Sequence, residues 1–509
     1  MRRLVNISGI TFAVYLVWKI TLLLATSQPI PANDSFFYDG PVVNYLLHGN
    51  YCNPSLAMVL QISGNEVFCA YPPLYQAVLL GWMKCFGTGE LSAMWLHVTL
   101  LAGFVLTVLQ IFRQLKIPGF VINIAGLFLF GITFHDRPDT LAHLIAALAV
   151  LAFVRGLPWA TAVFLTLTFC TSLQIGGIYS LWLGLFAASE AWFSKRAIPW
   201  AAIFSFVSAL AGLITLVKFG HPHLWDGFRE HLAITPSVTG LRVPRLDDTL
   251  KIVRSSPGIL LVFSMLVVLA LKWRGFLNQL KVSTQLRLAT SGTLAALALM
   301  GGCLVVLTPN TIHVGNYLQP LMVGCALAMI ASGSPFECKW QRTIRSLFLV
   351  AALLVSIRAM GMTTWGMLCH RDVNHAQALK LVNESLDSAQ DESAVFVSAA
   401  YLYNTAQRTN VTWLHSDWAS LANEGDWELR AIQERRPTRL LLTQFDYYRR
   451  YERIVSQFRR ERGDVKVDIL NTAKVQPPDA IPSMRRVVQH VSWAPVIVEF
   501  TWPSTTKTK

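Results

Sequence analysis

Residues 91–112, LSAMWLHVTLLAGFVLTVLQIF, form a run without Asp, Glu, Lys or Arg that is long enough to cross a bilayer as one helix. A membrane-spanning helix needs about 20 predominantly apolar residues. Similar runs recur through the first two thirds of the chain. The predicted spans are 4–26, 91–112, 118–134, 141–154, 158–173, 176–193, 197–217, 258–271, 288–308, 316–333 and 344–363. We therefore expect a mainly α-helical, polytopic membrane protein of about 11 transmembrane helices.

The composition of the whole chain supports this class. Of its 509 residues, 53% are hydrophobic and 14% are charged, and the mean hydropathy is +0.44. Soluble proteins contain about 45–50% apolar and about 25% charged residues. The composition excludes a single soluble globule, a disordered chain and a disulfide-rich secreted module.

The distribution of charged residues predicts how the chain is oriented in the membrane. Residues 1–363 contain 24 Lys and Arg but 12 Asp and Glu. With eleven spans and a cytoplasmic N-terminus, the long basic clusters all fall on the cytoplasmic side, as the positive-inside rule requires. Because these charges lie between apolar runs and not on one soluble face, nucleic acid is not expected as a partner.

The chain is predicted to have two parts, a transmembrane domain over 1–363 and an extracytoplasmic α/β domain over 364–509. Residues 27–90 form the first outer loop in this topology. Within it, the apolar stretch before Phe86-Gly87 would make a helix of about 20 Å, too short for a hydrocarbon core of about 30 Å. We therefore interpret that stretch as re-entrant or interfacial. The first apolar run has no clear cleavage site and is taken as an uncleaved span.

The predicted C-terminal domain differs in pattern from the rest of the chain. Short apolar runs at 394–397, 440–442, 465–469 and 496–498 alternate with polar helical stretches such as 444–462. This alternation predicts strands separated by helices.

Asp39 is the first candidate for chemistry. It follows Phe36-Phe37-Tyr38 and precedes Gly40-Pro41 in the first outer loop, where acidic residues are few. A carboxylate beside aromatic residues at a membrane face is poorly solvated, which suits it to proton abstraction. The alternative is a structural turn, because Asp-Gly-Pro is a strong turn signal.

The second candidate is His135-Asp136-Arg137-Pro138-Asp139-Thr140, at the outer junction of two predicted spans. Charged groups are costly near a bilayer, so this density of polar side chains suggests a use. Arg137 could bind a lipid phosphate. The alternative is that Asp139 or Thr140 caps the following helix and Arg137 lies among lipid headgroups.

These features together carry a family resemblance. Asp39 in a long first outer loop, Tyr71-Pro72-Pro73-Leu74-Tyr75 running on to Phe86-Gly87, and Arg137-Pro138-Asp139 occur in this order over about the first 190 residues. The arrangement resembles the GT-C membrane glycosyltransferases, in the branch of the protein mannosyltransferases and the lipid A aminoarabinose transferase. The sequence departs from the family in having Gly40 where many members have Glu. It also has Ala70-Tyr71 before the prolines, where some relatives have a lysine.

The resemblance implies a sugar donor carried on a polyprenyl phosphate, and transfer to a hydroxyl of a lipid, glycan or protein by one inverting displacement. Asp39 matches the catalytic base, Asp139 the second acid of the site and Arg137 the basic residue beside it. His135 and Tyr71 are taken as substrate-binding neighbours. The resemblance also implies a bacterial inner or plasma membrane, with the active site outside the cytoplasm.

Four further residues are weaker candidates for substrate binding. Arg229 and His231 lie in the basic 218–257 loop and could meet the charge of a leaving phosphate. An ordinary solvated loop beside anionic headgroups explains them equally well. His313 and Tyr317 lie at another outer junction, where an interfacial aromatic belt would also account for Tyr317.

No metal site is predicted, because no His or Cys pair has metal-ligand spacing. No cofactor is required by a phosphate-lipid donor, although Asp39 and Asp139 could share a divalent cation. Cys52 and Cys69 share the first outer loop and form either a disulfide or two thiols.

Two other function classes fit part of the pattern. A transporter or flippase of lipid-linked sugars agrees with the number of spans but lacks the paired half-repeats that many transporters show. A non-catalytic assembly subunit agrees with the C-terminal domain. Replacement of Asp39 discriminates them, because an enzyme would lose turnover and a scaffold would be unaffected.

Overall fold

The structure is a computed structural model. It describes residues 33–57, 59–117, 137–194, 200–219, 223–234, 273–306, 375–389, 395–408, 411–414, 427–443, 446–471 and 495–503, with a few isolated positions besides. Apart from such positions, the predicted spans 4–26, 118–134, 258–271, 316–333 and 344–363 lie outside the described residues.

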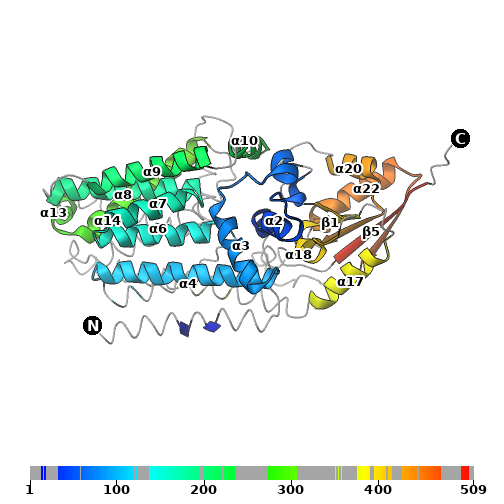
Figure 1. The fold of residues 1–509 in the computed structure, drawn as a ribbon, viewed down its shortest axis with the longest axis horizontal. Coiled ribbons are helices and arrows are strands. Elements are labelled where there is room, and N and C mark those ends of the chain that lie inside the picture. The colour runs from blue at the N-terminus through cyan, green and yellow to red at the C-terminus, as the bar shows by residue number, and fades with distance from the viewer. Residues whose placement is uncertain are drawn as a thin grey trace.

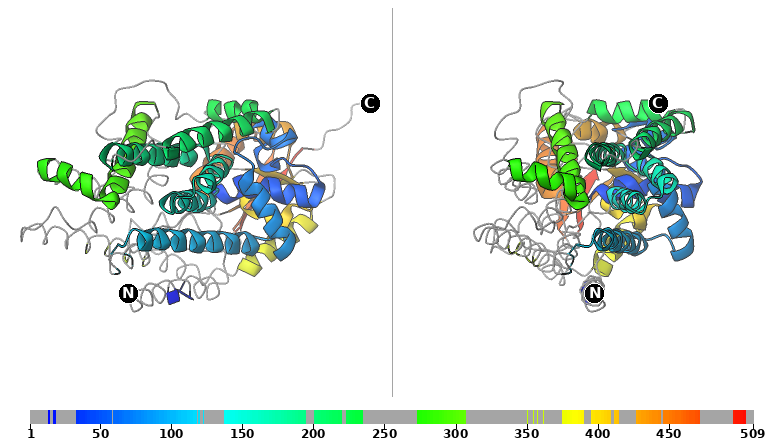
Figure 2. Two further views of the ribbon diagram at one scale, coloured as in Figure 1. Left: turned by 60° about the vertical axis from the view of Figure 1, so that its left-hand side comes forward. Right: turned by 90° about the vertical axis from the view of Figure 1, so that its left-hand side faces the viewer.

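A bundle of apolar helices makes up one end of the molecule (Figure 1). Its members are α4 (Glu90–Gln114), α6 (Asp139–Val154), α7 (Pro158–Phe169), α8 (Leu173–Ser194), α9 (Trp200–Phe219) and α14 (Thr284–Val306). Each corresponds to a predicted span, and Figure 2 shows several of them end-on, side by side. Among the described residues, Leu91–Gln114 alone is long and apolar enough by length and composition to cross a membrane. Asp139–Val154, Pro158–Phe169 and Ser205–Thr215 are apolar but shorter.

The turn between α6 and α7 follows directly from the sequence. Gly156 has a φ of +72°, a conformation that ends helices and that glycine adopts without steric cost. Pro158 then occupies the first turn of α7, where a missing N–H does no harm. The short connection makes α6 and α7 antiparallel neighbours.

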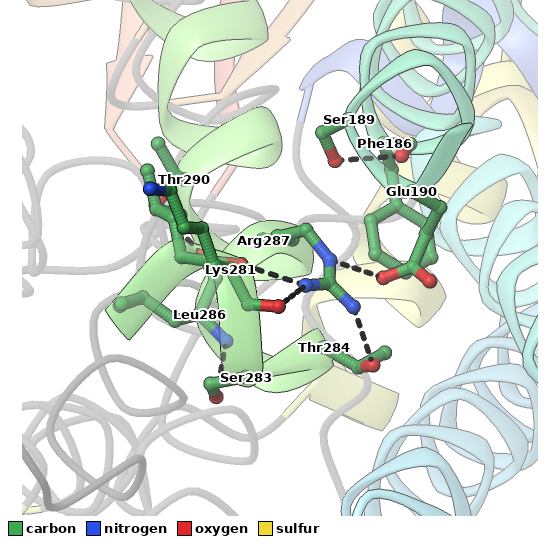
Figure 3. Close-up of polar contacts among 10 residues, drawn as sticks. Phe186, Ser189, Glu190, Lys281, Ser283, Thr284, Leu286, Arg287 and Thr290 are labelled. Atoms are coloured by element: carbon green, nitrogen blue, oxygen red, sulfur yellow. Dashed lines mark hydrogen bonds and ion pairs between the residues drawn. The ribbon is translucent and has the colours of Figure 1, made fainter. Parts of the chain in front are cut away.

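Arg287 joins α8, α13 and α14, and α13 and α14 lie at the end of the bundle distant from the sheet (Figure 1). Figure 3 shows its contacts. Its buried guanidinium forms an ion pair with Glu190 of α8 at 2.5 Å. It also donates to the carbonyls of Leu280 and Lys281, in the last turn of α13 (Trp273–Val282). A cation at this place is favourable because the carbonyls of the last turn carry partial negative charge.

The segment between the bundle and the sheet contains short helices. It comprises α2 (Asn33–His48), the single turns η1 (Pro54–Leu56) and η2 (Ile62–Glu66), and α3 (Leu74–Phe86). The 13 residues of α3 rise about 20 Å, so the helix has the short length expected from the sequence. The separate helix α10 (Leu224–Ile234) docks here, because the Glu230 carboxylate accepts from the backbone N–H groups of Gln61 and Ile62 at the start of η2.

The C-terminal part is a five-stranded mixed sheet with the strand order β2-β1-β3-β5-β4. The strands are β1 (Val395–Ser398), β2 (Val411–Leu414), β3 (Arg439–Thr443), β4 (Lys466–Asn471) and β5 (Pro495–Thr501). β1 pairs in parallel with β2 and β3, whereas β5 is antiparallel to β3 and β4. The helical elements of this part are α17 (His375–Asp387), η3 (Ala399–Tyr401), α18 (Leu402–Thr405), α20 (Trp427–Arg435), η4 (Tyr447–Tyr451) and α22 (Glu452–Glu461). The predicted alternation of strands and helices is confirmed, and β2 is a strand that the prediction missed.

The sheet and the short helices share one hydrophobic core. Successive residues of β1 point to opposite faces of the sheet. Val395 and Val397 pack in a cluster with Phe36 of α2 and Tyr75 of α3. Phe396 points the other way, into a second cluster with Phe458 of α22. The C-terminal sheet is therefore packed directly against the segment that contains Asp39.

Candidate active site

Asp39 lies inside a helix and not in a turn. Helix α2 continues through Gly40 and Pro41, so the turn alternative is wrong. Proline has no N–H, which leaves the carbonyl of Phe37, four residues earlier, without its helical donor. The Asn53 side chain supplies one: its Nδ2 donates to the carbonyls of Phe36 and Phe37, each at 2.9 Å.

Gly40 makes room for this contact. A Cβ atom at Gly40 would lie 2.5 Å from Oδ1 and 2.7 Å from Nδ2 of Asn53. The fully buried Asn53 also accepts from the Ser55 N–H and hydroxyl, so it has little freedom to withdraw. Any larger side chain at position 40 would collide with Asn53 as it is placed in this structure.

The Asp39 carboxylate is buried and held at both oxygens. Only 1% of the residue is exposed. Oδ1 accepts from the Tyr75 hydroxyl at 2.8 Å, and Oδ2 accepts from the Tyr403 hydroxyl at 2.7 Å. Hydrogen bonds to a carboxylate favour its ionised form, which is the form that can accept a proton.

A histidine, His97, contacts the hydroxyl group of Tyr75. Nε2 of His97, on α4, lies 2.9 Å from the Tyr75 hydroxyl oxygen, and His97 is buried. Since the hydroxyl proton of Tyr75 goes to Asp39, Nε2 of His97 must carry the proton in this second bond. The result is a buried chain from His97 through Tyr75 to Asp39.

Arg137 and Asp139 lie beside this chain. Nε of Arg137 is 3.0 Å from Oδ2 of Asp139. Its Nη2 donates to the Tyr38 hydroxyl at 3.3 Å, and the guanidinium carbon lies 5.8 Å from the centre of the Tyr38 ring. Helix α6 begins at Asp139, and its N-cap residue is Pro138, whose side chain makes no capping hydrogen bond. The capping explanation for Asp139 and Thr140 is therefore wrong.

Aromatic rings connect Arg137 to α10. Tyr71 packs edge-on against Tyr38 with the ring centres 4.9 Å apart, and His231 lies 6.2 Å from Tyr71 and 5.8 Å from Phe37. Burial, together with the charge of Arg137, lowers the pKa of His231 to about 4. His231 is therefore neutral near pH 7, and it can form hydrogen bonds there but adds no charge.

The structure thus brings together five of the residues predicted from the sequence: Asp39, Tyr71, Arg137, Asp139 and His231. Arg229 lies exposed on α10, the helix that carries His231. His135, His313 and Tyr317 lie outside the described residues.

Sequence reasoning missed Tyr38, Tyr75, His97, Asn53 and Tyr403. Tyr75 belongs to a motif that the sequence had already singled out, but its partner was not evident. Tyr403 lies 364 positions from Asp39, so no local pattern could have joined them.

Cys52 and Cys69 are two buried thiols in the structure and not a disulfide. Burial and three nearby acidic side chains raise the pKa of Cys69 to about 12, so its thiol stays protonated. In the described part of the chain, no group of three or more His, Cys, Asp and Glu side chains is placed to hold a metal ion.

No protein-family model matches the sequence, and no curated protein matches it. Solved structures do match. The structure of ArnT from Cupriavidus metallidurans bound to undecaprenyl phosphate superposes with a TM-score of 0.51 over 97% of each chain, at 12% identity. The apo structure of the same protein gives a TM-score of 0.51 at 11% identity, over 95% of this chain and 97% of that chain. ArnT is a lipid A aminoarabinose transferase of the GT-C kind, so the chain is similar in fold, over nearly its whole length, to the family that its sequence resembles.

Proposed function

We propose that the protein is an integral-membrane glycosyltransferase that moves a sugar from a polyprenyl-phosphate donor to an acceptor hydroxyl. The observation that carries this proposal is the buried Asp39 carboxylate, held by two tyrosine hydroxyls beside the Arg137–Asp139 pair. A buried carboxylate that accepts hydrogen bonds from neutral donors has the geometry of a general base.

The fold supports the donor class. The ArnT structure that matches this chain is bound to undecaprenyl phosphate, a polyprenyl phosphate. In our proposal the Arg137 guanidinium meets the phosphate of such a lipid, because guanidinium geometry matches phosphate oxygens. Tyr71 and the neutral His231, whose rings contact each other, are proposed to offer hydrogen bonds to the same phosphate.

The proposed reaction is a single inverting displacement. Asp39 accepts the proton of the acceptor hydroxyl while the acceptor oxygen forms a bond to the anomeric carbon of the donor. The bond between that carbon and the phosphate oxygen breaks with its electron pair, so the lipid phosphate leaves as an anion. Arg137 stabilises the charge that develops on the phosphate. No metal or cofactor takes part in the proposed steps.

A membrane location is supported by an apolar face on α9. Ile203, Phe206, Leu210, Leu213 and Ile214 are between 39% and 71% exposed, and their spacing places them on one side of the helix. Large exposed apolar faces mark interaction surfaces. We propose lipid as the occupant, with the site and the sheet outside the cytoplasm.

The proposal is tested with membranes that contain the full-length chain. They are incubated with labelled undecaprenyl-phosphate aminoarabinose and with a panel of other labelled polyprenyl-phosphate sugars, and transfer to lipid, glycan and protein fractions is measured. We expect transfer from at least one donor by the wild type and a fall of at least about 100-fold in Arg137→Ala. Arg155→Ala, at an exposed arginine directly after α6, is the matched control and should transfer normally. Movement of a lipid-linked sugar across vesicles without transfer would instead favour a flippase.

A further inference from the structure

Tyr403 approaches Asp39 from the C-terminal part of the chain. It lies on α18, shortly after β1 ends, and its hydroxyl donates to Oδ2 of Asp39 at 2.7 Å. The other oxygen of the carboxylate accepts from Tyr75 of α3, in the segment between the bundle and the sheet. Two parts of the chain that are distant in sequence therefore meet at one carboxylate.

Two contacts made directly after Tyr403 fix the end of helix α18, one with α2 and one with β2. Nε2 of His48, at the end of α2, lies 2.7 Å from the carbonyl oxygen of Ala406. The Trp413 indole of β2 donates to the hydroxyl of Thr405 at 2.8 Å. The Tyr403 ring also packs edge-on against Phe36, with the ring centres 6.2 Å apart. The position of the Tyr403 hydroxyl is thus determined by the sheet as well as by α2.

The two tyrosines differ in their surroundings. Tyr75 is fully buried and backed by His97, whereas Tyr403 is half-buried. In the described part of the chain, the titratable groups that contact Asp39 from elements packed on α2 include Tyr75 of α3, with His97 of α4 behind it, and Tyr403 of α18. Arg137 and Asp139 lie next to Tyr38, one residue from Asp39.

We propose that Tyr403 is a positioning residue for Asp39, so that the C-terminal sheet completes the candidate active site through α18. Its hydroxyl fixes the orientation of the carboxylate and stabilises the ionised form. The catalytic meaning of this role rests on the proposed function, in which Asp39 is the base. The hydrogen bond and its effect on protonation do not depend on that function.

The test measures the protonation of Asp39 directly. Dicyclohexylcarbodiimide, a hydrophobic reagent that reacts with protonated carboxyl groups, is applied to the full-length protein in detergent across a range of pH from acid to alkaline. Labelling of the peptide that contains Asp39 is followed by mass spectrometry. Tyr403→Phe keeps the ring and removes the hydroxyl, so it isolates the hydrogen bond from the packing. Tyr45→Phe, an exposed tyrosine on the same helix as Asp39, is the control.

We expect the midpoint of labelling to move upward by about one pH unit in Tyr403→Phe, because the lost donor had stabilised the charged carboxylate. Tyr45→Phe should follow the wild type. If Tyr403→Phe and the wild type are labelled to the same extent at every pH, the proposal is overturned, whether that labelling is strong or absent.

Sugar transfer is measured on the same preparations. If the wild type transfers sugar, the acid limb of its pH profile should move upward in Tyr403→Phe, and transfer should recover at higher pH. If no donor is used and the labelling midpoint still moves, the proposed function fails and the role of Tyr403 stands.

Discussion

At the scale of single residues, Gly40 permits the contact that keeps α2 intact around Asp39. Gly40→Ala would place a methyl group 2.5 Å from Oδ1 of the fully buried Asn53. Either Asn53 withdraws from the Phe36 and Phe37 carbonyls or α2 shifts. Overpacking of this kind costs about 1–3 kcal/mol. We expect a lower midpoint of thermal unfolding for the detergent-solubilised variant.

The control for this prediction is Gly81→Ala in α3. Nothing lies within 4 Å of the added Cβ atom at that position, and alanine is the better helix former. Gly81→Ala should therefore leave the unfolding midpoint unchanged or raise it. Equal effects at the two glycines would contradict the role given to Gly40.

His231 predicts a pH dependence of stability. Its pKa is about 4 in the folded protein, below the ordinary value of 6.5, chiefly because of burial. Between these values the unfolded chain binds a proton that the folded protein does not. The free energy of unfolding should therefore fall as the pH is lowered from about 7 to about 4.

Replacement of His231 separates this effect from other titrations. The free energy of unfolding is measured by chemical unfolding at neutral pH and at about pH 5. In His231→Gln, the part of its decrease that comes from protonation of His231 should disappear. The control is His223→Gln, at an exposed histidine just before α10, where the decrease should be retained. An undiminished decrease in His231→Gln would show that another group is responsible.

At the scale of elements, Arg287 connects α8, α13 and α14 (Figure 3). Arg287→Ala removes the partner of Glu190 and the donors to the last carbonyls of α13. Breaking a buried pair from one side costs about 3–5 kcal/mol, and partial exposure of Glu190 places this case at the lower end. We expect a clear loss of thermal stability, and Lys281→Ala, at an exposed position of α13, should have little effect. Similar midpoints for the two variants would contradict this account.

The sequence predicted the helices of the bundle but not the helix that contains Asp39. The apolar runs predicted α4, α6, α7, α8, α9 and α14, because a long hydrophobic run has few other structures open to it. The Asp39-Gly40-Pro41 stretch was ambiguous because proline usually interrupts a helix. The helix continues there through Asn53, a compensation from further along the chain that the local pattern does not contain.

At the scale of the whole molecule, the candidate site depends on contacts between distant parts of the chain. The local sequence singled out Asp39, Arg137 and Asp139. Tyr403, by contrast, reaches Asp39 from α18, in the part of the chain that the sequence placed in a separate domain. The shared core, which includes Phe36, Tyr75, Val397 and Trp413, is what brings these parts together. Contacts between residues so distant in the sequence depend on tertiary packing, which a single sequence does not reveal.

The central claim is that Asp39 acts as the base and does not merely hold the fold together. It is tested most directly by measuring, on one preparation of Asp39→Asn, both binding of undecaprenyl phosphate and transfer from the donor that the wild type uses. Asparagine has the same shape but is no base, so we predict wild-type affinity for the lipid and a loss of transfer of at least about 100-fold. Transfer at the wild-type rate with unchanged affinity would contradict the claim.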